Sequence, residues 1–169
     1  MSRLDSMIRR LNAQRACLDA ASERIADLPG PVLEIGLGNG RTYDHLRERL
    51  PERTILVFDR TVAAHPDCVP PLDALFLGEL EDTLPRARER IGATVALAHA
   101  DIGSGHAGQD RAVAALLSRL LPPLMRPGGI MVSDQPLSGG AFVSEPPPKG
   151  VAADRYFLYC RRGDHQGSF

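Results

Sequence analysis

The sequence predicts an α/β protein with three layers, in which helices cover both faces of a doubly wound, mostly parallel sheet, with an additional helix at the N-terminus. Short apolar runs alternate with amphipathic stretches, and the runs lack the polar alternation of half-exposed strands. A glycine-rich turn directly follows the first apolar run. At 169 residues, the chain has room for one domain spanning residues 1–169, since domains average roughly 150 residues.

Residues 1–28 are predicted to form the N-terminal helix, with its regular part from Ser2 to Leu28. Pro29 and Pro31 end it, because proline cannot donate a backbone hydrogen bond and restricts the residue before it. Apolar residues recur here at seven-residue steps, at Leu4, Leu11, Leu18 and Ile25. This spacing leaves two interpretations open, which are packing on the domain and self-association into a homo-oligomer through this helix.

The following elements alternate between strand and helix. The apolar runs predict strands at Val32–Ile35, Ile55–Phe58, Leu75–Leu77, Val95–Ala98 and Ile130–Val132. Helices are predicted between them at Thr42–Leu50, Thr83–Ile91 and Arg111–Leu121. Such alternation requires crossover connections, which join parallel strands and are right-handed.

The C-terminal part departs from this alternation. Arg155–Arg161 is rich in aromatic residues and predicts a last strand. No helical stretch precedes it, so we expect an antiparallel neighbour, for which Phe142–Ser144 is a weaker candidate.

The composition of the chain limits which classes of partner we expect. The chain has 20 basic and 21 acidic residues, and Lys149 is its only lysine, so we expect no nucleic-acid partner. No apolar run approaches the roughly 20 residues of a membrane span, and no signal-peptide core is visible. Three distant cysteines offer neither a disulfide framework nor a metal knuckle. We therefore expect a cytoplasmic protein that does not contact a membrane.

The glycine-rich turn is the strongest candidate for a binding site. It reads Glu34-Ile35-Gly36-Leu37-Gly38-Asn39-Gly40-Arg41-Thr42, and alternate glycines let the backbone turn sharply and approach a ligand. The next strand is followed by Asp59, a carboxylate suited to ribose hydroxyls. A dinucleotide fingerprint needs a third glycine where Arg41 stands, so NAD remains only a weaker alternative.

At these residues the chain resembles the class I S-adenosylmethionine-dependent methyltransferases, whose first motif is [D/E]-x-G-x-G-x-G. Ile55–Asp59 and Leu77–Glu79 resemble the second and third strands of that family. Val95–Asp101 and Arg126–Asp134 resemble its fourth and fifth strands. The resemblance implies a Rossmann-like fold, S-adenosyl-L-methionine as cofactor, and a small bacterial branch of unassigned substrate.

Carried over residue by residue, the resemblance implies a cofactor site along this edge of the sheet. Glu34 would lie near the ammonium group of the cofactor, Asp59 would hold the ribose, and Glu79 would sit beside the adenine. Alternatively, Glu34 organises the turn, Asp59 caps it, and Glu79 favours the start of the next helix. The predicted cofactor-binding residues are Glu34, Gly36, Leu37, Gly38, Asn39, Gly40, Thr42, Asp59, Arg60, Glu79 and Asp101.

The methyl acceptor is expected to be a small molecule that presents oxygen or nitrogen. Such an acceptor often needs a base, and His99, Asp101 and Asp134 are the catalytic candidates. No metal is predicted, although Asp101, Asp134 and Gln135 leave open a Mg²⁺ site similar to that of catechol-type O-methyltransferases. The non-enzymatic alternative is a module that binds S-adenosylmethionine or oligomerises without catalysis.

Overall fold

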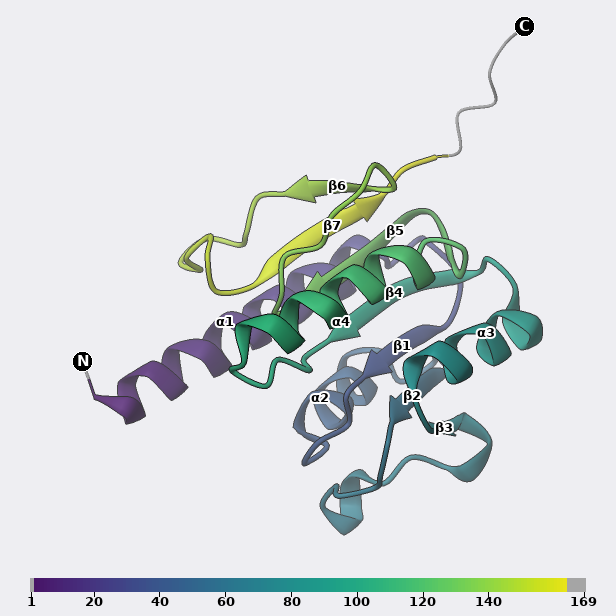
Figure 1. Cartoon of the computed structure of the whole chain (residues 1–169), viewed down its shortest axis with the longest axis horizontal. Helices are drawn as coiled ribbons and strands as arrows, with labels where there is room; N and C mark the ends of the chain where they lie inside the picture. The colour runs from purple at the N-terminus through teal and green to yellow at the C-terminus, as the bar shows by residue number, and fades with distance from the viewer. Residues whose placement is uncertain (1, 164–169) are drawn as a thin grey trace, which may run out of the picture.

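Seven strands form one sheet at the centre of the protein (Figure 1). They are β1 (Val32–Ile35), β2 (Ile55–Asp59), β3 (Leu75–Leu77), β4 (Val95–Ala100), β5 (Met125–Ser133), β6 (Phe142–Glu145) and β7 (Phe157–Arg161). Their order across the sheet is β3-β2-β1-β4-β5-β7-β6. The computed structural model describes residues 2–163. β1 to β5 pair in parallel, whereas β7 runs antiparallel to β5 and to β6.

The order reverses between β1 and β4, because the chain moves outward to β3 and then returns to the other side of β1. Ligands of doubly wound sheets bind at the carboxyl ends of the strands on either side of such a reversal. The antiparallel pairing of the last strand with β5, and of Phe142–Glu145 with that strand, confirms the expectation for the C-terminal part.

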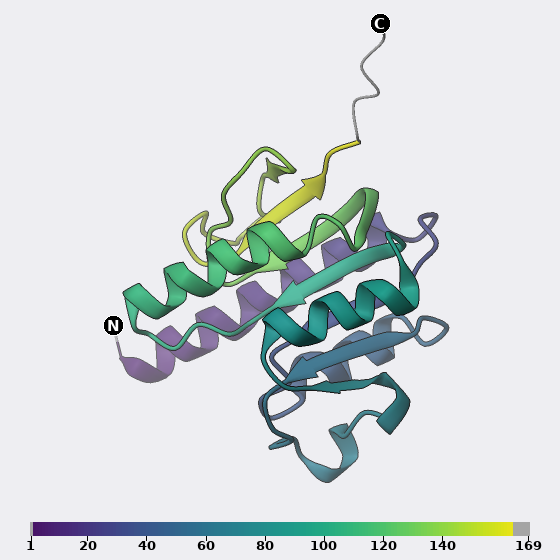
Figure 2. The same cartoon turned by 45° about the vertical axis from the view of Figure 1, so that its right-hand side comes forward.

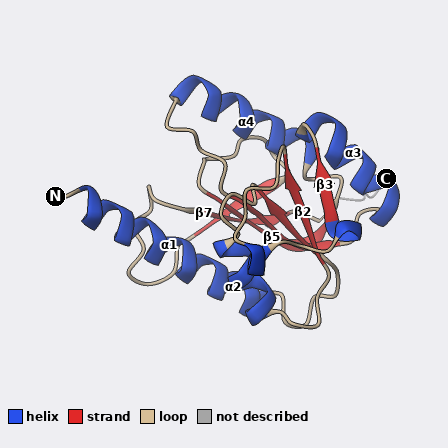
Figure 3. Cartoon of the chain, turned by 90° about the horizontal axis from the view of Figure 1, so that it is seen from below, coloured by secondary structure: helices blue, strands red, loops and turns tan. Residues whose placement is uncertain are grey.

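Four helices cover the sheet: α1 (Arg3–Arg24), α2 (Arg41–Arg49), α3 (Leu80–Ile91) and α4 (Ala107–Leu120). Seen along the sheet in Figure 3, α1 and α2 lie on one face and α3 and α4 on the other. Each face has its own apolar core, built for example around Leu18 and Leu46 on the first face and around Leu84 and Leu117 on the second. The predicted three-layer α/β fold is therefore confirmed.

Helix α1 is packed along only part of its length. Its second half buries Cys17, Leu18 and Ala21 against the sheet. Its first half extends past the arrowheads of β4 and β5 in Figures 1 and 2, and it exposes Leu4 and Leu11 of the seven-step series. The apolar spacing thus serves packing in the second half, and self-association through the first half stays a prediction.

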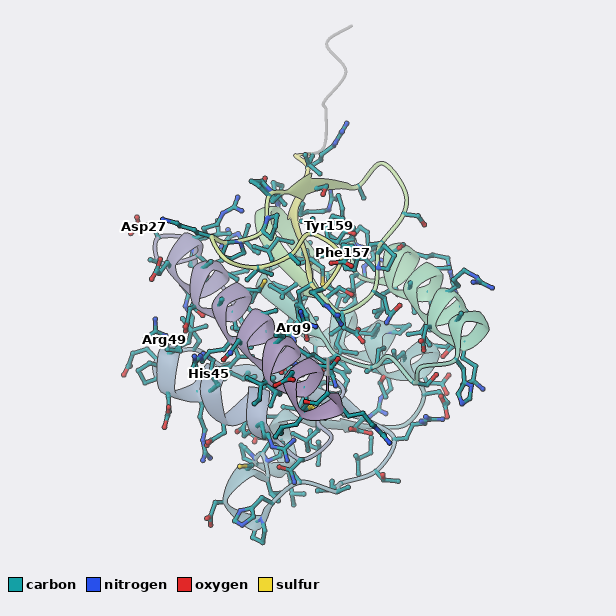
Figure 4. The ribbon with its side chains drawn as sticks, turned by 90° about the vertical axis from the view of Figure 1, so that its left-hand side faces the viewer. Arg9, Asp27, His45, Arg49, Phe157 and Tyr159 are labelled. Carbon is teal, nitrogen blue, oxygen red and sulfur yellow. The ribbon has the colours of Figure 1, made fainter. Side chains whose placement is uncertain are left out.

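Polar contacts connect α1 to α2 and to the segment that follows α1. Asp19 on α1 lies 3.0 Å from the His45 ring and 2.9 Å from the Arg49 guanidinium of α2, and Figure 4 shows both α2 residues beside α1. Arg53 donates to the backbone oxygens of Ile25, Leu28 and Gly30 just after the helix. In the described part of the chain, no helix is apolar enough over sufficient length to cross a membrane.

Candidate functional site

A cavity of about 530 Å³ lies at the carboxyl ends of β1, β2, β3 and β4, where the strand order reverses. Its walls combine the turn after β1, the residues that follow β2, β3 and β4, and one side of α4. The lining includes Gly36, Gly38, Asp59, Arg60, Glu79, Leu80, Asp101, Ile102, Val113 and Leu116. A larger hollow of about 890 Å³ lies at the amino ends of the strands, opposite to the edge at which such sheets bind ligands.

The turn after β1 forms the floor of this cavity. Gly36, Gly38 and Gly40 have φ angles of 90°, 50° and 88°, a region that favours glycine. At Gly36 a Cβ atom would overlap the Ile102 side chain and lie 2.9 Å from the Asp101 carbonyl oxygen. At Gly38 the corresponding position has no heavy atom within 4 Å, so a side chain there would extend into open space.

The other residues of the turn have separate places. Leu37 is buried in the core beneath it, and Asn39 is exposed. The Thr42 hydroxyl, in the first turn of α2, donates to Glu34. Contacts of these three residues with the cofactor stay predictions.

Asp59 joins the ends of β1 and β2. One of its carboxylate oxygens accepts from the Arg60 backbone N–H at 2.7 Å, and the other accepts from the Gly38 N–H at 3.1 Å. Glu79 is exposed on the cavity wall just before α3. Both carboxylates therefore face the space where a nucleoside was expected, and their roles toward ribose and adenine stay predictions.

Glu34 lies elsewhere. It is fully buried, one oxygen accepts from Thr42, and the other lies 2.7 Å from the His99 Nδ1 atom. In the described structure Glu34 organises the turn from below. It has no exposed atom that could contact the ammonium group of a cofactor.

His99 is also fully buried and belongs to a chain of polar side chains. Its Nε2 atom lies 3.0 Å from the Tyr156 hydroxyl. Burial opposes the charged imidazole, but the negative charges of Glu34, Asp101 and Asp134, with the hydrogen bond to Glu34, together outweigh it and raise the pKa of His99. Because no atom of His99 reaches the cavity, it cannot contact an acceptor in this arrangement, and we assign it to the buried chain.

Helix α1 continues this chain to the cavity. Gln14 donates to the Tyr156 hydroxyl at 2.8 Å and to Asp101 at 2.7 Å. Arg10 donates to both Asp101 oxygens, at 2.6 and 2.7 Å. Burial raises the pKa of the Tyr156 hydroxyl, which stays protonated. Arg10, Gln14 and Tyr156 were not among the site residues predicted from the sequence. One sequence feature could have indicated Gln14, because it is a polar residue on the buried face of an amphipathic helix.

Asp101 and Asp134 follow the neighbouring strands β4 and β5. Asp101 lines the cavity, and Asp134 accepts from the Gly103 N–H at 2.8 Å. Burial, together with the negative charge of Asp101, raises the pKa of Asp134. The structure thus brings together two of the three predicted catalytic residues.

Arg10 would compete with a magnesium ion for the Asp101 carboxylate. Arg10 already neutralises Asp101, so a metal ion between the two aspartates would have to displace its guanidinium. Within residues 2–163, no group of three or more histidine, cysteine or acidic side chains has a geometry suited to a metal ion.

The cavity fits an adenosyl group. Asp59 offers hydrogen-bond acceptors to a ribose diol, Leu80 and Leu116 offer apolar surface to a base, and the open position at Gly38 admits the ligand beside the backbone. This combination of a few polar groups on a mostly apolar wall is typical of cofactor sites.

Comparison with known proteins agrees with this geometry. A family model described as S-adenosyl-L-methionine methyltransferase matches residues 1–162. A solved S-adenosyl-L-methionine methyl transferase from Silicibacter pomeroyi DSS-3 is 47% identical, with 96% of this chain and 99% of that chain covered and a TM-score of 0.90. No curated protein matches the sequence.

More distant structures share the fold alone. The antibiotic-resistance methyltransferase Kmr has a TM-score of 0.56 at 13% identity, covering 88% of this chain and 93% of its own. The MycE methyltransferase of mycinamycin biosynthesis, solved with Mg, SAH and mycinamycin VI, has a TM-score of 0.55 at 17% identity, covering 89% and 46%.

Proposed function

Because the chain belongs to the S-adenosyl-L-methionine methyltransferase family, we propose that it transfers the methyl group of this cofactor to an oxygen or nitrogen atom of a small molecule. The family shows the cofactor and the class of enzyme, and the acceptor is the proposed part. The observation that carries the proposal is that Asp101 lines the cavity and that Asp134, at the end of the adjacent strand, lies close enough for the charge of Asp101 to raise its pKa.

The residues around the cavity would hold the cofactor in a defined position. In this arrangement Asp59 would accept hydrogen bonds from the ribose hydroxyls, and Glu79 would lie beside the adenine. The backbone of Gly36 and Gly38 would contact the rest of the cofactor. When bound, the cofactor supplies an electrophilic methyl group on a positively charged sulfur. The contribution of the protein is largely the alignment of acceptor and methyl group, which is worth up to several kcal/mol.

We assign to Asp134 the role of the base that removes a proton from the methyl acceptor. Alcohols and ammonium groups must lose a proton to become nucleophiles, and a base works best when its pKa lies near the working pH. Burial and Asp101 raise the pKa of Asp134 toward that range. The Gly103 N–H fixes one of its oxygens, so the carboxylate keeps its orientation. Asp101 is less suited to this role, because Arg10 holds it in an ion pair.

A small acceptor agrees with the charge of the protein. The net charge of −1 gives the protein no overall electrostatic attraction to a nucleic acid. On the cavity side, the described residues between β4 and α4 form only the short segment 101–106, and α4 supplies the adjoining wall with Ala112, Val113 and Leu116. An acceptor bound beside these elements would contact few residues, which suits a small molecule better than a macromolecule.

The test is formation of S-adenosylhomocysteine with a panel of small alcohols, phenols and amines, compared between the wild type, Asp134→Asn and Glu89→Gln. Glu89 is exposed on α3, outside the cavity lining, and serves as the matched control. We expect Asp134→Asn to lower kcat by roughly 10²–10⁴-fold with unchanged affinity for S-adenosylhomocysteine. Undiminished turnover in this variant would exclude Asp134 as the base, and methylation of nucleic acid or protein alone would overturn the small acceptor.

A further inference from the structure

Arg10 uses only part of its guanidinium group within the protein. Both contacts with Asp101 come from the Nη2 atom. Within residues 2–163, no hydrogen bond joins its Nε or Nη1 atoms to another residue, and the side chain is 44% exposed. Donors therefore remain for a ligand.

The Arg10–Asp101 pair reaches the cavity through Asp101, and Arg10 contacts this carboxylate from α1. Asp101 lines the cavity, and its backbone is packed so closely on the Gly36 turn that a Cβ atom on Gly36 would lie 2.9 Å from its carbonyl oxygen. Gln14 holds the Asp101 carboxylate from α1, and Asp19 holds α1 to α2. The cation and the anion are thus fixed before any ligand binds.

The methionine half of the cofactor ends in an ammonium and a carboxylate group, and it needs charged partners beside the glycine turn. Glu34, the acidic residue of that motif, is fully buried and bonded to Thr42 and His99. Arg60 lines the cavity next to Asp59, on the side assigned to the ribose. On the other side of the turn, the Arg10–Asp101 pair combines both signs of charge.

We propose that the Arg10–Asp101 pair binds the amino-acid end of the cofactor, with the free donors of Arg10 holding its carboxylate and Asp101 facing its ammonium group. Charge-assisted hydrogen bonds of this kind are about twice as strong as neutral ones. This inference rests on the cofactor of the family and is independent of the acceptor and of Asp134.

The test compares two ligands that differ only in the amino-acid end. S-adenosylhomocysteine carries it, and 5′-methylthioadenosine lacks it, and both are titrated calorimetrically into the full-length protein. We expect Arg10→Met to weaken S-adenosylhomocysteine roughly 10- to 100-fold and to change the affinity for methylthioadenosine by less than twofold. Arg10→Lys, which keeps the charge, should recover part of the loss. Arg9→Met is the matched control, because Arg9 is the exposed neighbour on α1 labelled in Figure 4.

Three results would overturn the inference. An unchanged affinity for S-adenosylhomocysteine in Arg10→Met would show that the guanidinium does not touch the ligand, and an equal loss for both ligands would show that Arg10 only holds α1 in place. A selective loss in Arg60→Met, without one in Arg10→Met, would assign the carboxylate to Arg60. Because these titrations need no acceptor, failure here leaves the proposal for Asp134 to its own test.

Discussion

Replacing His99 with leucine should strongly destabilise the protein. The change removes both polar contacts of the ring, the one of 2.7 Å to Glu34 and the one of 3.0 Å to Tyr156. Glu34 has no exposed surface, so its second oxygen loses its only partner in a region without water. Breaking a buried ion pair by removing one partner costs about 3–5 kcal/mol, which is a large share of the roughly 5–15 kcal/mol that stabilises a domain.

Urea denaturation at neutral pH measures this loss as a change in the free energy of unfolding. A double-mutant cycle isolates the pair, with Glu34→Gln, His99→Leu and the combination. We expect a coupling free energy of about 1–3 kcal/mol, because the double variant leaves no buried charge. A loss below about 1 kcal/mol in His99→Leu, or strict additivity in the cycle, would refute the reasoning.

The pH dependence gives an independent check on the same pair. The pKa of His99 is raised above 6.5 in the folded state, so protonation favours folding. Its contribution is complete below the unfolded pKa of 6.5 and is lost as the pH rises through the raised value. The free energy of unfolding should therefore decrease between pH 6 and 9 more in the wild type than in His99→Leu.

Three further predictions concern the cofactor cavity and the core. Gly38→Val should abolish detectable binding of S-adenosylhomocysteine, because the new side chain strains a φ of 50° and enters the open space at the turn; retained affinity would place the ligand elsewhere. Asp59→Ala should lower the affinity for S-adenosylhomocysteine roughly 10-fold or more in calorimetry. The substitution removes the proposed acceptor for the ribose hydroxyls and the hydrogen bond from the Gly38 N–H. Asp73→Ala, on the exposed surface, should leave this affinity unchanged. Burial raises the pKa of Cys17 to about 11, so this thiol should react with a disulfide reagent at pH 8 only after denaturation; rapid labelling of Cys17 in the native protein would contradict its burial.

Fold and strand positions could be read from the sequence where a short, continuous apolar run marks a strand. The predicted bounds of Val32–Ile35 and Leu75–Leu77 coincide with β1 and β3. The fifth strand was predicted too short, because Pro127, Gly128 and Gly129 interrupt its apolar pattern although the backbone pairs with β4 from Met125 onward. A shift of register between Val95 and Leu97 accommodates this irregular start.

The candidate site could be predicted only in part, for a physical reason. Asp59, Glu79 and Asp101 each follow a strand, and the carboxyl ends of parallel strands meet at one edge. Periodicity predicts which face of a helix is buried, but not which residue lies opposite. Arg10 and Gln14 therefore gave no sign in the sequence that they would contact Asp101, which lies 91 and 87 residues further along the chain.

The bond between Gln14 and Tyr156 joins residues 142 positions apart, and it has a consequence for biosynthesis. A nascent polypeptide that ends before Tyr156 already contains the glycine turn, Asp59, Asp101 and Asp134. In such a polypeptide Gln14 and His99 lack the hydroxyl between them, and β5 lacks its neighbour on one side. Completion of this part of the interior therefore waits until the segment that carries Tyr156 and β7 has been synthesised. We expect a product that ends before Tyr156 to keep unsatisfied polar groups and an open sheet edge, and therefore to be cleaved by proteases more readily than the folded chain.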